Sequence, residues 1–187
     1  MRLYALCDQD MLDIKGISLS DYIELAKQNS AEIIQYRNKS ASLSLIKEEL
    51  IKIRKMFDGF VIVNDAYELV EFCDGVHLGQ EDLLKINSDK FKAIETLRSI
   101  IGKDKILGIS THNEDEVIQA NKMDLNYIGL GAYRNTTTKK DITNILGNKL
   151  DSIALLSHHP VAVIGGVKLE DSFDNITYHV IGSGLVK

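Results

Sequence analysis

The chain has 187 residues, of which 44% are hydrophobic and 26% charged, and it contains a single proline. This composition is typical of one ordinary globular domain, expected to span residues 1–187, and it excludes a disordered or fibrous protein. The net charge of -5 disfavours a surface for nucleic acid or an anionic membrane, so we expect a small-molecule partner.

The cysteines and the first residues indicate the compartment. Cys7 and Cys73 lie far apart and form no CxxC motif, which is typical of a reduced cytosol. Met1 and Arg2 run directly into an apolar segment without the leader of a signal peptide. No apolar stretch approaches the roughly 20 residues that cross a bilayer. We therefore predict a cytoplasmic protein without a membrane partner.

Short apolar runs recur along the whole chain. They have the continuous pattern of strands buried on both faces. The predicted strands are residues 3–6, 32–36, 60–63, 75–78, 106–109, 127–130, 161–164 and 178–181.

Helical patterns separate most of these runs. We predict helices over residues 20–29, 44–56 and 113–121, the last opening with Asn113 and carrying Glu116 three residues on. Eight strand-and-helix units most economically close a parallel TIM (β/α)8 barrel, because right-handed crossovers wind one way. A doubly wound open sheet is the alternative.

Polar residues follow the predicted strands consistently. In a parallel barrel the carboxyl ends of the strands gather on one face, where barrel enzymes build their active sites. The segments are Asn64-Asp65, Gln80-Glu81-Asp82, Ser110-Thr111-His112, residues 136–139, Gly165-Gly166 and Ser183.

Asp65 and Asp82 are acids that follow successive apolar runs. Two carboxylates beside a phosphate suit Mg²⁺, which takes oxygen ligands and completes its shell with substrate phosphates and water. The pair therefore predicts a protein that handles a diphosphate.

Gln35, Arg37 and Lys39 alternate along a predicted strand, which places them on one face. Two cations inside a barrel are costly unless an anion meets them, so this face is a candidate anion site. The alternative is an edge strand with one solvated face. Gly165-Gly166 offers backbone amides to a phosphate, although a plain turn fits the same pair.

Six fragments in order resemble the thiamine phosphate synthases over nearly the whole chain. They are residues 35–39 (QYRNK), 64–65 (ND), 77–82 (HLGQED), 108–113 (GISTHN), 136–141 (TTTKKD) and 164–167 (IGGV). The resemblance implies a TIM barrel that joins hydroxymethylpyrimidine diphosphate to thiazole phosphate, with release of pyrophosphate.

The resemblance also implies roles for individual residues. It assigns Asp65 and Asp82 to Mg²⁺, and Thr136, Thr138, Gly166 and Ser183 to the thiazole phosphate. The residues that it assigns to the pyrimidine diphosphate are Gln35, Arg37, Lys39, Asn64, Ser110 and Lys139, of which Lys139, Ser110 and Arg37 are the predicted catalytic residues.

The chain departs from the family in two places. Arg134-Asn135 replaces an aromatic or aliphatic residue and a proline, so the thiazole pocket and its substrate could differ. Only residues 167–176 separate the last two predicted strands, and little follows Ser183. We therefore expect a seventh helix that is short or absent and a missing last helix. Without that helix, Leu3, Ala5 and the surroundings of Val180 should form an apolar patch that a homodimer would cover.

Two other functions remain open. A related thiazole tautomerase family is similar in carrying a histidine where His112 stands, although this residue could equally bind substrate or cap the next helix. The shortened end would suit a catalytically weak paralogue that binds thiamine-related phosphates. The acid pair favours the synthase, because an isomerase of thiazole needs no diphosphate-bound metal.

Overall fold

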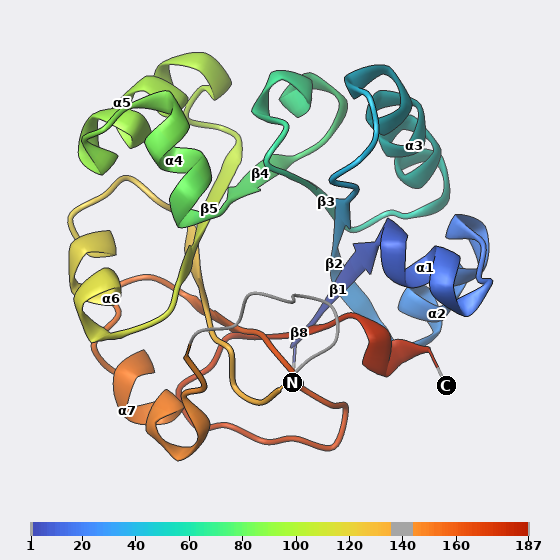
Figure 1. Ribbon diagram of the computed structural model, residues 1–187. Coiled ribbons are helices and arrows are strands. Elements are labelled where there is room, and N and C mark those ends of the chain that lie inside the picture. The colour runs from blue at the N-terminus through green and yellow to red at the C-terminus, as the bar shows by residue number, and fades with distance from the viewer. Residues whose placement is uncertain (1, 136–143, 187) are drawn as a thin grey trace.

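The computed structural model describes residues 2–135 and 144–186. Eight parallel strands close a barrel in sequence order, a TIM barrel (Figure 1). Every predicted strand is confirmed to within two residues. The strands are β1 (Arg2–Asp8), β2 (Ala31–Arg37), β3 (Phe60–Asn64), β4 (Gly75–Leu78), β5 (Ile106–Thr111), β6 (Tyr127–Leu130), β7 (Val161–Val163) and β8 (Tyr178–Ile181).

Helices surround the barrel on the outside (Figure 1). In the described residues the α-helices are α1 (Gln9–Lys15), α2 (Leu19–Gln28), α3 (Leu43–Met56), α4 (Gln80–Ile86), α5 (Lys90–Ile101), α6 (Glu114–Ala120) and α7 (Leu150–Ala154). Short 3-10 turns are η1 (Tyr67–Phe72), η2 (Gly147–Lys149) and η3 (Ser183–Leu185). The three predicted helices, α2, α3 and α6, are confirmed to within one residue at each end.

Each predicted helix begins at a side-chain cap. Ser18, Ser42 and Asn113 accept hydrogen bonds from the backbone N–H three residues on, which satisfies a donor that the first helical turn leaves unpaired. Two helices outside the prediction, α1 and α5, also have side-chain caps: Asp8 accepts from the N–H of Met11 and Asp89 from that of Phe91.

Alternation along the strands produces two apolar layers. Inward side chains fill the barrel, and outward side chains pack against the helices in a much larger cluster. The inward cluster consists of Tyr4, Leu6, Ile33, Ile62, Tyr127, Ala162 and Val180. Inward positions nearer the carboxyl ends of the strands are free to carry polar groups.

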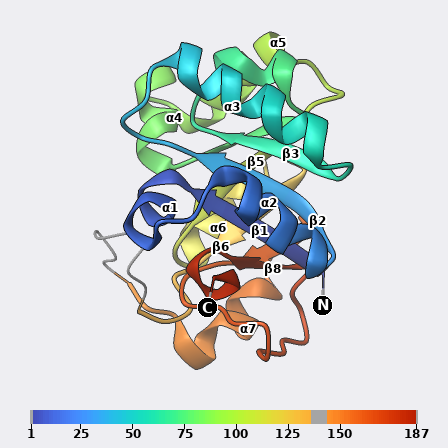
Figure 2. The ribbon, with the colours of Figure 1, turned by 90° about the vertical axis from the view of Figure 1, so that its right-hand side faces the viewer.

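The region around β8 differs from the expectation of an uncovered patch. Leu3 is 2% exposed, Ala5 0% and Val180 5%, so the predicted patch is wrong. Val180 faces the barrel interior, whereas Leu3 and Ala5 pack in the outer cluster with α2 and the last residues. Figure 2 shows α2 beside β1 and β8. The homodimer stays a prediction, without this surface to support it.

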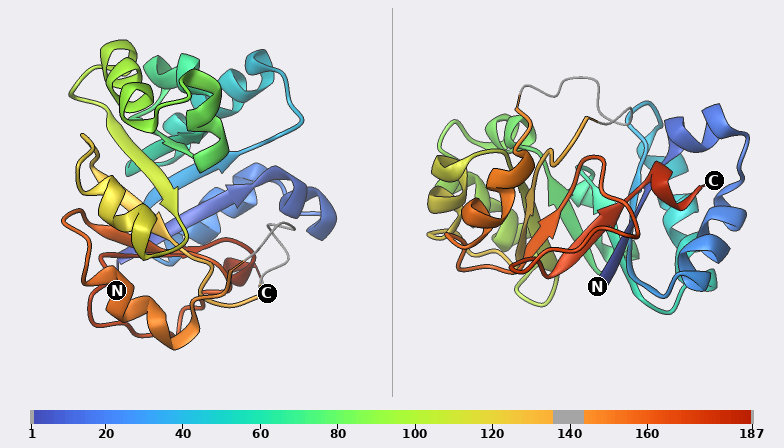
Figure 3. Two further views of the ribbon diagram at one scale, coloured as in Figure 1. Left: turned by 60° about the vertical axis from the view of Figure 1, so that its left-hand side comes forward. Right: turned by 90° about the horizontal axis from the view of Figure 1, so that it is seen from below.

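The last residues lie against the first helix. Lys15 of α1 donates a hydrogen bond of 2.8 Å to the carbonyl oxygen of Val186, and Figures 1 and 3 show η3 near α1. Residues 164–177, between β7 and β8, contain no helix. That a further helix is missing after β8 stays a prediction.

No helix within residues 2–135 and 144–186 has the length and apolar character that crossing a membrane requires.

Candidate active site

The acid pair forms at the carboxyl ends of β3 and β4. Asp65 directly follows β3, and its backbone N–H donates 2.9 Å to the carbonyl oxygen of His77 on β4. Its φ of 62° lies in the left-handed region, which an aspartate tolerates better than most residues. Asp82 stands in the first turn of α4, close enough for its carboxyl group to hydrogen-bond with that of Asp65. The two predicted metal ligands therefore meet.

The two carboxyl groups differ in protonation. Burial, together with the charge of Asp82 and the hydrogen bond to it, raises the pKa of Asp65 to about 6. Burial also works to raise the pKa of Asp82, but hydrogen bonds from Lys85 and Asp65 outweigh it and lower that pKa. Lys85 donates to Asp82 over 2.6 Å. The pair therefore carries about one proton in mildly acidic solution.

A dication fits this donor set. Two carboxylates that compete for a proton can exchange it for a metal ion, since a cation relieves the repulsion that raises the pKa of Asp65. No group of three or more His, Cys, Asp or Glu side chains within the described ranges could form a complete protein site. Such a sparse site suits Mg²⁺, which keeps water and substrate phosphates as its other ligands.

Two amides connect the acid pair to β2. Asn64 donates through Nδ2 to Oδ2 of Asp65 over 2.5 Å, and Gln35 donates through Nε2 to Oδ1 of Asn64 over 2.7 Å. Gln35 is only 4% exposed. The predicted residues Gln35, Asn64 and Asp65 thus form one hydrogen-bonded group.

The two predicted cations, at the end of β2 and two residues beyond it, have different environments. Lys39 is exposed, and its charge works to lower the pKa of both Asp65 and Asp82, so it lies near the acid pair. Arg37 instead forms a short ion pair with Asp8, a residue that the sequence interpretation missed. The side chain of Asp8 is 3% exposed and also caps α1. The anion that Arg37 requires inside the barrel is therefore supplied by the chain itself.

Ser110 lies at the end of β5 beside two polar neighbours. Its hydroxyl is 3.0 Å from Nε2 of His77, and its carbonyl oxygen accepts from Nε2 of Gln80 over 2.5 Å. His77 follows the inward alternation of β4 and is 8% exposed. Sequence interpretation treated His77 only as part of a motif and assigned it no role.

The loop after β7 requires both of its glycines. Gly165 and Gly166 have φ of 91° and 67°, which side chains of L-residues rarely adopt. A Cβ on Gly166 would lie 2.8 Å from Cβ of Arg134, so the loops after β6 and β7 are in close contact. Ser183 lies in η3 after β8. Thr136, Thr138 and Lys139 lie outside the described residues.

The comparison with protein families decides the identity of this barrel. The sequence profile of the thiamine monophosphate synthase family matches residues 3–183. The chain belongs to this family.

Individual relatives agree with the family match. A thiamine-phosphate synthase from Persephonella marina is 35% identical over 93% of this chain and 80% of its own length. A thiamine-phosphate synthase from Clostridium botulinum is 32% identical over 98% of this chain and 84% of its own length. The predicted family and its enzyme class, a transferase of thiamine biosynthesis, are thereby confirmed.

A solved structure supports the fold. The thiamine phosphate pyrophosphorylase from Pyrococcus furiosus aligns with a TM-score of 0.76 and 23% identity, covering 97% of this chain and 85% of that one. At this identity the likeness concerns the fold alone.

The departure from the family at Arg134 has a structural partner. Arg134 forms two hydrogen bonds of 2.8 Å with the carboxylate of Asp171, which belongs to the helix-free segment between β7 and β8. It also donates to the carbonyl oxygen of Gly166 over 3.3 Å. Arg134 therefore joins the two loops that were expected to hold the thiazole phosphate.

His112 contacts a side chain in the first turn of α6, the helix that Asn113 caps. Its backbone N–H donates to Oε2 of Glu116 over 2.8 Å, and its Nδ1 lies 2.9 Å from the same oxygen. The three roles considered for His112 stay predictions.

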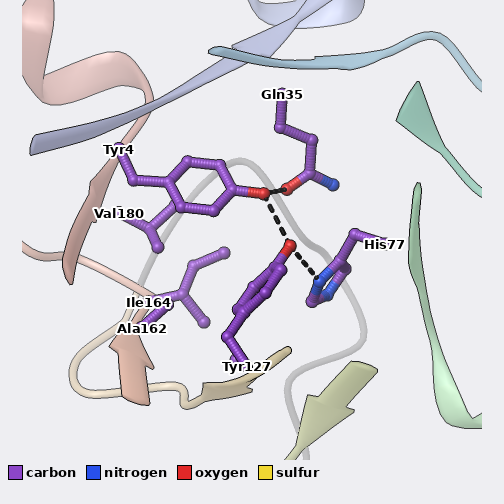
Figure 4. Close-up of a pocket in the computed structure, with 8 residues that line it drawn as sticks. Tyr4, Gln35, His77, Tyr127, Ala162, Ile164 and Val180 are labelled. Carbon is purple, nitrogen blue, oxygen red and sulfur yellow. Dashed lines mark hydrogen bonds between the residues drawn. The ribbon is translucent and has the colours of Figure 1, made fainter. Parts of the chain in front are cut away.

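The barrel interior contains a hollow of about 10 Å³, roughly the space of one water molecule (Figure 4). It is too small for either substrate. Its polar walls are formed by Tyr4, Gln35, His77 and Tyr127, which are hydrogen-bonded to one another. The two tyrosines were missed because aromatic residues in a buried strand usually serve packing.

Proposed function

We propose that this protein joins hydroxymethylpyrimidine diphosphate to thiazole phosphate, forming thiamine phosphate and pyrophosphate, in a reaction that depends on Mg²⁺. The observation that carries the proposal is the Asp65–Asp82 pair at the mouth of a barrel of this family. A diphosphate leaving group and a dication are the chemistry that such a pair serves.

The reaction needs charge neutralisation more than acid–base catalysis. The C–O bond between the pyrimidine methylene and the diphosphate breaks, and its electron pair leaves with pyrophosphate. Electron release from the pyrimidine ring stabilises the resulting cation, and the thiazole nitrogen then forms the new C–N bond. Bound Mg²⁺ would supply positive charge to the departing pyrophosphate.

The chain's own residues would hold and orient the substrates. Asp65 and Asp82 would hold the metal, and Lys39 adds a positive charge beside them. Asn64 and Gln35 would orient the pyrimidine diphosphate together with Ser110, which lies at the end of β5 beside His77 and Gln80. Arg37 would act on the diphosphate only if it divides its donors between substrate and Asp8.

The remaining assignments extend the proposal to the second substrate. Thr136, Thr138, Gly166 and Ser183 would hold the thiazole phosphate, and Lys139 would contribute to the diphosphate site. The close contact of the Gly166 loop with Arg134 supports a phosphate pocket formed jointly by the loops after β6 and β7.

One assay tests the reaction itself. Purified protein with both substrates and Mg²⁺ should form thiamine phosphate, and excess chelator should abolish the product. Asp65→Asn and Asp82→Asn should each lower turnover by 10²–10³-fold, because roughly 3–4 kcal/mol of transition-state stabilisation is lost.

The matched control is Asp58→Asn, which neutralises an exposed carboxylate away from the pair and should leave turnover unchanged. Full activity in chelator, or in either variant of the acid pair, would contradict the metal role. A protein that is folded but forms no product under any condition would support the weak-paralogue alternative.

A further inference from the structure

A chain of hydrogen bonds crosses the barrel interior from Ser110. The hydroxyl of Ser110 is 3.0 Å from Nε2 of His77, whose Nδ1 is 2.8 Å from the hydroxyl of Tyr127. That hydroxyl is 2.9 Å from the hydroxyl of Tyr4. Figure 4 shows the bonds from His77 through Tyr127 to Tyr4.

The chain continues from Tyr4 to the acid pair. Tyr4 donates to Oε1 of Gln35 over 2.7 Å, and Gln35 donates to Asn64 over 2.7 Å. Asn64 donates to Asp65 over 2.5 Å. Five side chains therefore connect Ser110, a predicted substrate-binding residue, with Asp65, a predicted metal ligand.

The amide of Asn64 sets the direction of the first half. Its Nδ2 donates to Oδ2 of Asp65, so its Oδ1 faces Gln35 as an acceptor. Gln35 must then donate with Nε2 and accept with Oε1. Tyr4 therefore donates its only hydroxyl proton to Gln35.

The same reasoning sets the second half. Since the proton of Tyr4 is used, Tyr127 must donate to Tyr4 rather than accept from it. Tyr127 can then only accept from His77, which requires the proton on Nδ1. Nε2 of His77 is left as an acceptor for the hydroxyl of Ser110. Every donor in the chain thus points toward Asp65.

Two glycines leave the space that the rings of Tyr127 and His77 occupy. A Cβ on Gly108 would lie 2.2 Å from Cζ of Tyr127, and one on Gly129 would lie 3.1 Å from Cε1 of His77. Tyr4 is 1% exposed and Tyr127 4%. Burial raises the pKa of both phenols, so each keeps the single proton that the argument assigns to it.

We propose that Tyr4, Tyr127 and His77 are positioning residues that relay the orientation of the Asn64 and Gln35 amides to the hydroxyl of Ser110. The relay holds His77 as the Nδ1–H tautomer, so Ser110 donates inward to His77 and faces the substrate as a hydrogen-bond acceptor. Ser110 therefore selects an N–H or O–H donor on the substrate. The inference rests on the proposed function, because its two ends are residues of that site.

The tautomer of His77 can be measured without any substrate. The ¹⁵N shifts of the imidazole distinguish Nδ1–H from Nε2–H, and a His77→Gln variant assigns the signal among the five histidines. We expect Nδ1–H in the unaltered protein. A proton on Nε2 would overturn the relay, and this outcome needs no variant to fold.

Tyr4→Phe tests the transmission. Without the Tyr4 hydroxyl, Tyr127 can donate to Nδ1 of His77, so the proton should move to Nε2. Ser110 should then accept from His77 and become a donor toward the substrate. Tyr178→Phe is the matched control, because Tyr178 packs edge-on against Tyr4 at 6.3 Å between ring centroids but takes no part in the chain. An unchanged tautomer in folded Tyr4→Phe would overturn the relay.

Kinetics test whether the relay matters for the reaction. Tyr4→Phe and Tyr127→Phe should lower kcat about tenfold while KM for thiazole phosphate changes less than twofold, and Tyr178→Phe should change neither. An unchanged kcat with a switched tautomer would reject the positioning role. If the unaltered protein forms no thiamine phosphate, the proposed function fails, and the spectra still decide the relay on their own.

Discussion

The fold raises the pKa of Asp65 above the ordinary value of an aspartate. Its pKa is raised from 3.8 to about 6, so the folded state binds a proton more tightly than the unfolded chain does. The resulting stabilisation is complete below about pH 4 and is lost as the pH rises through 6. At neutral pH without metal, the ionised Asp65 therefore destabilises the protein.

Asp65→Asn should consequently stabilise the metal-free protein while it lowers turnover. We expect a gain of about 1–2 kcal/mol in the free energy of unfolding at pH 7.5, after allowing for solvent screening. Urea unfolding in chelator measures it. The gain should vanish at pH 4, and an equal gain at both pH values would show that charge is not its cause.

Mutation of Arg37 and mutation of Lys39 should have different effects on stability. Arg37→Ala leaves Asp8 charged and buried, since the two side chains are 12% and 3% exposed, and should destabilise the fold by roughly 3 kcal/mol. Lys39→Ala removes an exposed charge and should leave stability within about 0.5 kcal/mol.

Adding Asp8→Asn to Arg37→Ala provides the control, because the amide can still cap α1 but no longer carries an unpaired charge. The double variant should regain part of the lost stability in urea unfolding. If the two effects simply add, the Arg37–Asp8 pair does not couple and the argument fails.

At the scale of elements, periodicity predicted the strands better than the helices. Strands such as β4 and β6, buried on both faces, leave an uninterrupted apolar run that few other structures require. The helix α1 was missed because it follows β1 with no intervening turn residues, and Asp8 serves as the last residue of the strand and as the cap. One residue with two structural roles has no separate signal in the sequence.

Contacts between elements were predictable only in part. The acid pair was accessible from the sequence because each acid follows a strand that closes at the same face. The Arg37–Asp8 ion pair and the Tyr4–Tyr127 contact join strands 29 and 123 residues apart, and they depend on which inward side chains meet across the barrel. Alternation predicts whether a side chain points into the barrel or outward, but not which side chain it contacts there.

The segment between β7 and β8 should respond to pH through His179. This side chain is 4% exposed on the outer face of β8, where it packs against Phe173 at 5.0 Å between ring centroids. Burial, with the nearby N-terminal amine, lowers its pKa against the opposing charge of Asp171. The folded state thus prefers neutral His179, and the stabilisation present above pH 6.5 is lost as the pH falls.

Hydrogen exchange can follow this response. Corrected for intrinsic rates, protection of residues 164–177 should fall between pH 7 and pH 5 and should stay constant in His179→Phe. The exposed His158 provides the control, and His158→Phe should respond as the unaltered protein does. The Arg134–Asp171 ion pair should persist throughout, because its hydrogen bonds outweigh burial and lower the pKa of Asp171.

For the whole molecule, closure of the barrel depends on the junction of β1 with β8. Tyr22 of α2 is fully buried, and its hydroxyl donates 2.9 Å to the carbonyl oxygen of Leu6 and lies 3.4 Å from that of Ile181. One side chain thus contacts both strands of the junction. The expected apolar patch is absent there because α2 and the last described residues cover it.

Tyr22→Phe should therefore destabilise the whole barrel by about 1–2 kcal/mol, since it leaves a buried carbonyl without its donor. Thermal or urea unfolding should show one cooperative transition at lower stability. Tyr67→Phe, in a half-buried 3-10 turn away from the junction, should change stability by less than 0.5 kcal/mol. Equal effects of the two variants would mean that the Tyr22 hydrogen bonds at the junction contribute no more to stability than the Tyr67 hydroxyl does.

The aligned hydrogen bonds between Ser110 and Asp65 are also an array of dipoles. Each hydroxyl, imidazole and amide has its positive end toward Asp65, so their potentials add across the barrel as peptide dipoles add along a helix. The field favours negative charge at the acid pair and positive charge at the Ser110 end. Charge separates in this same sense when a pyrimidine cation parts from a pyrophosphate bound beside Asp65, so the hydrogen-bond directions polarise the barrel for the bond that it would break.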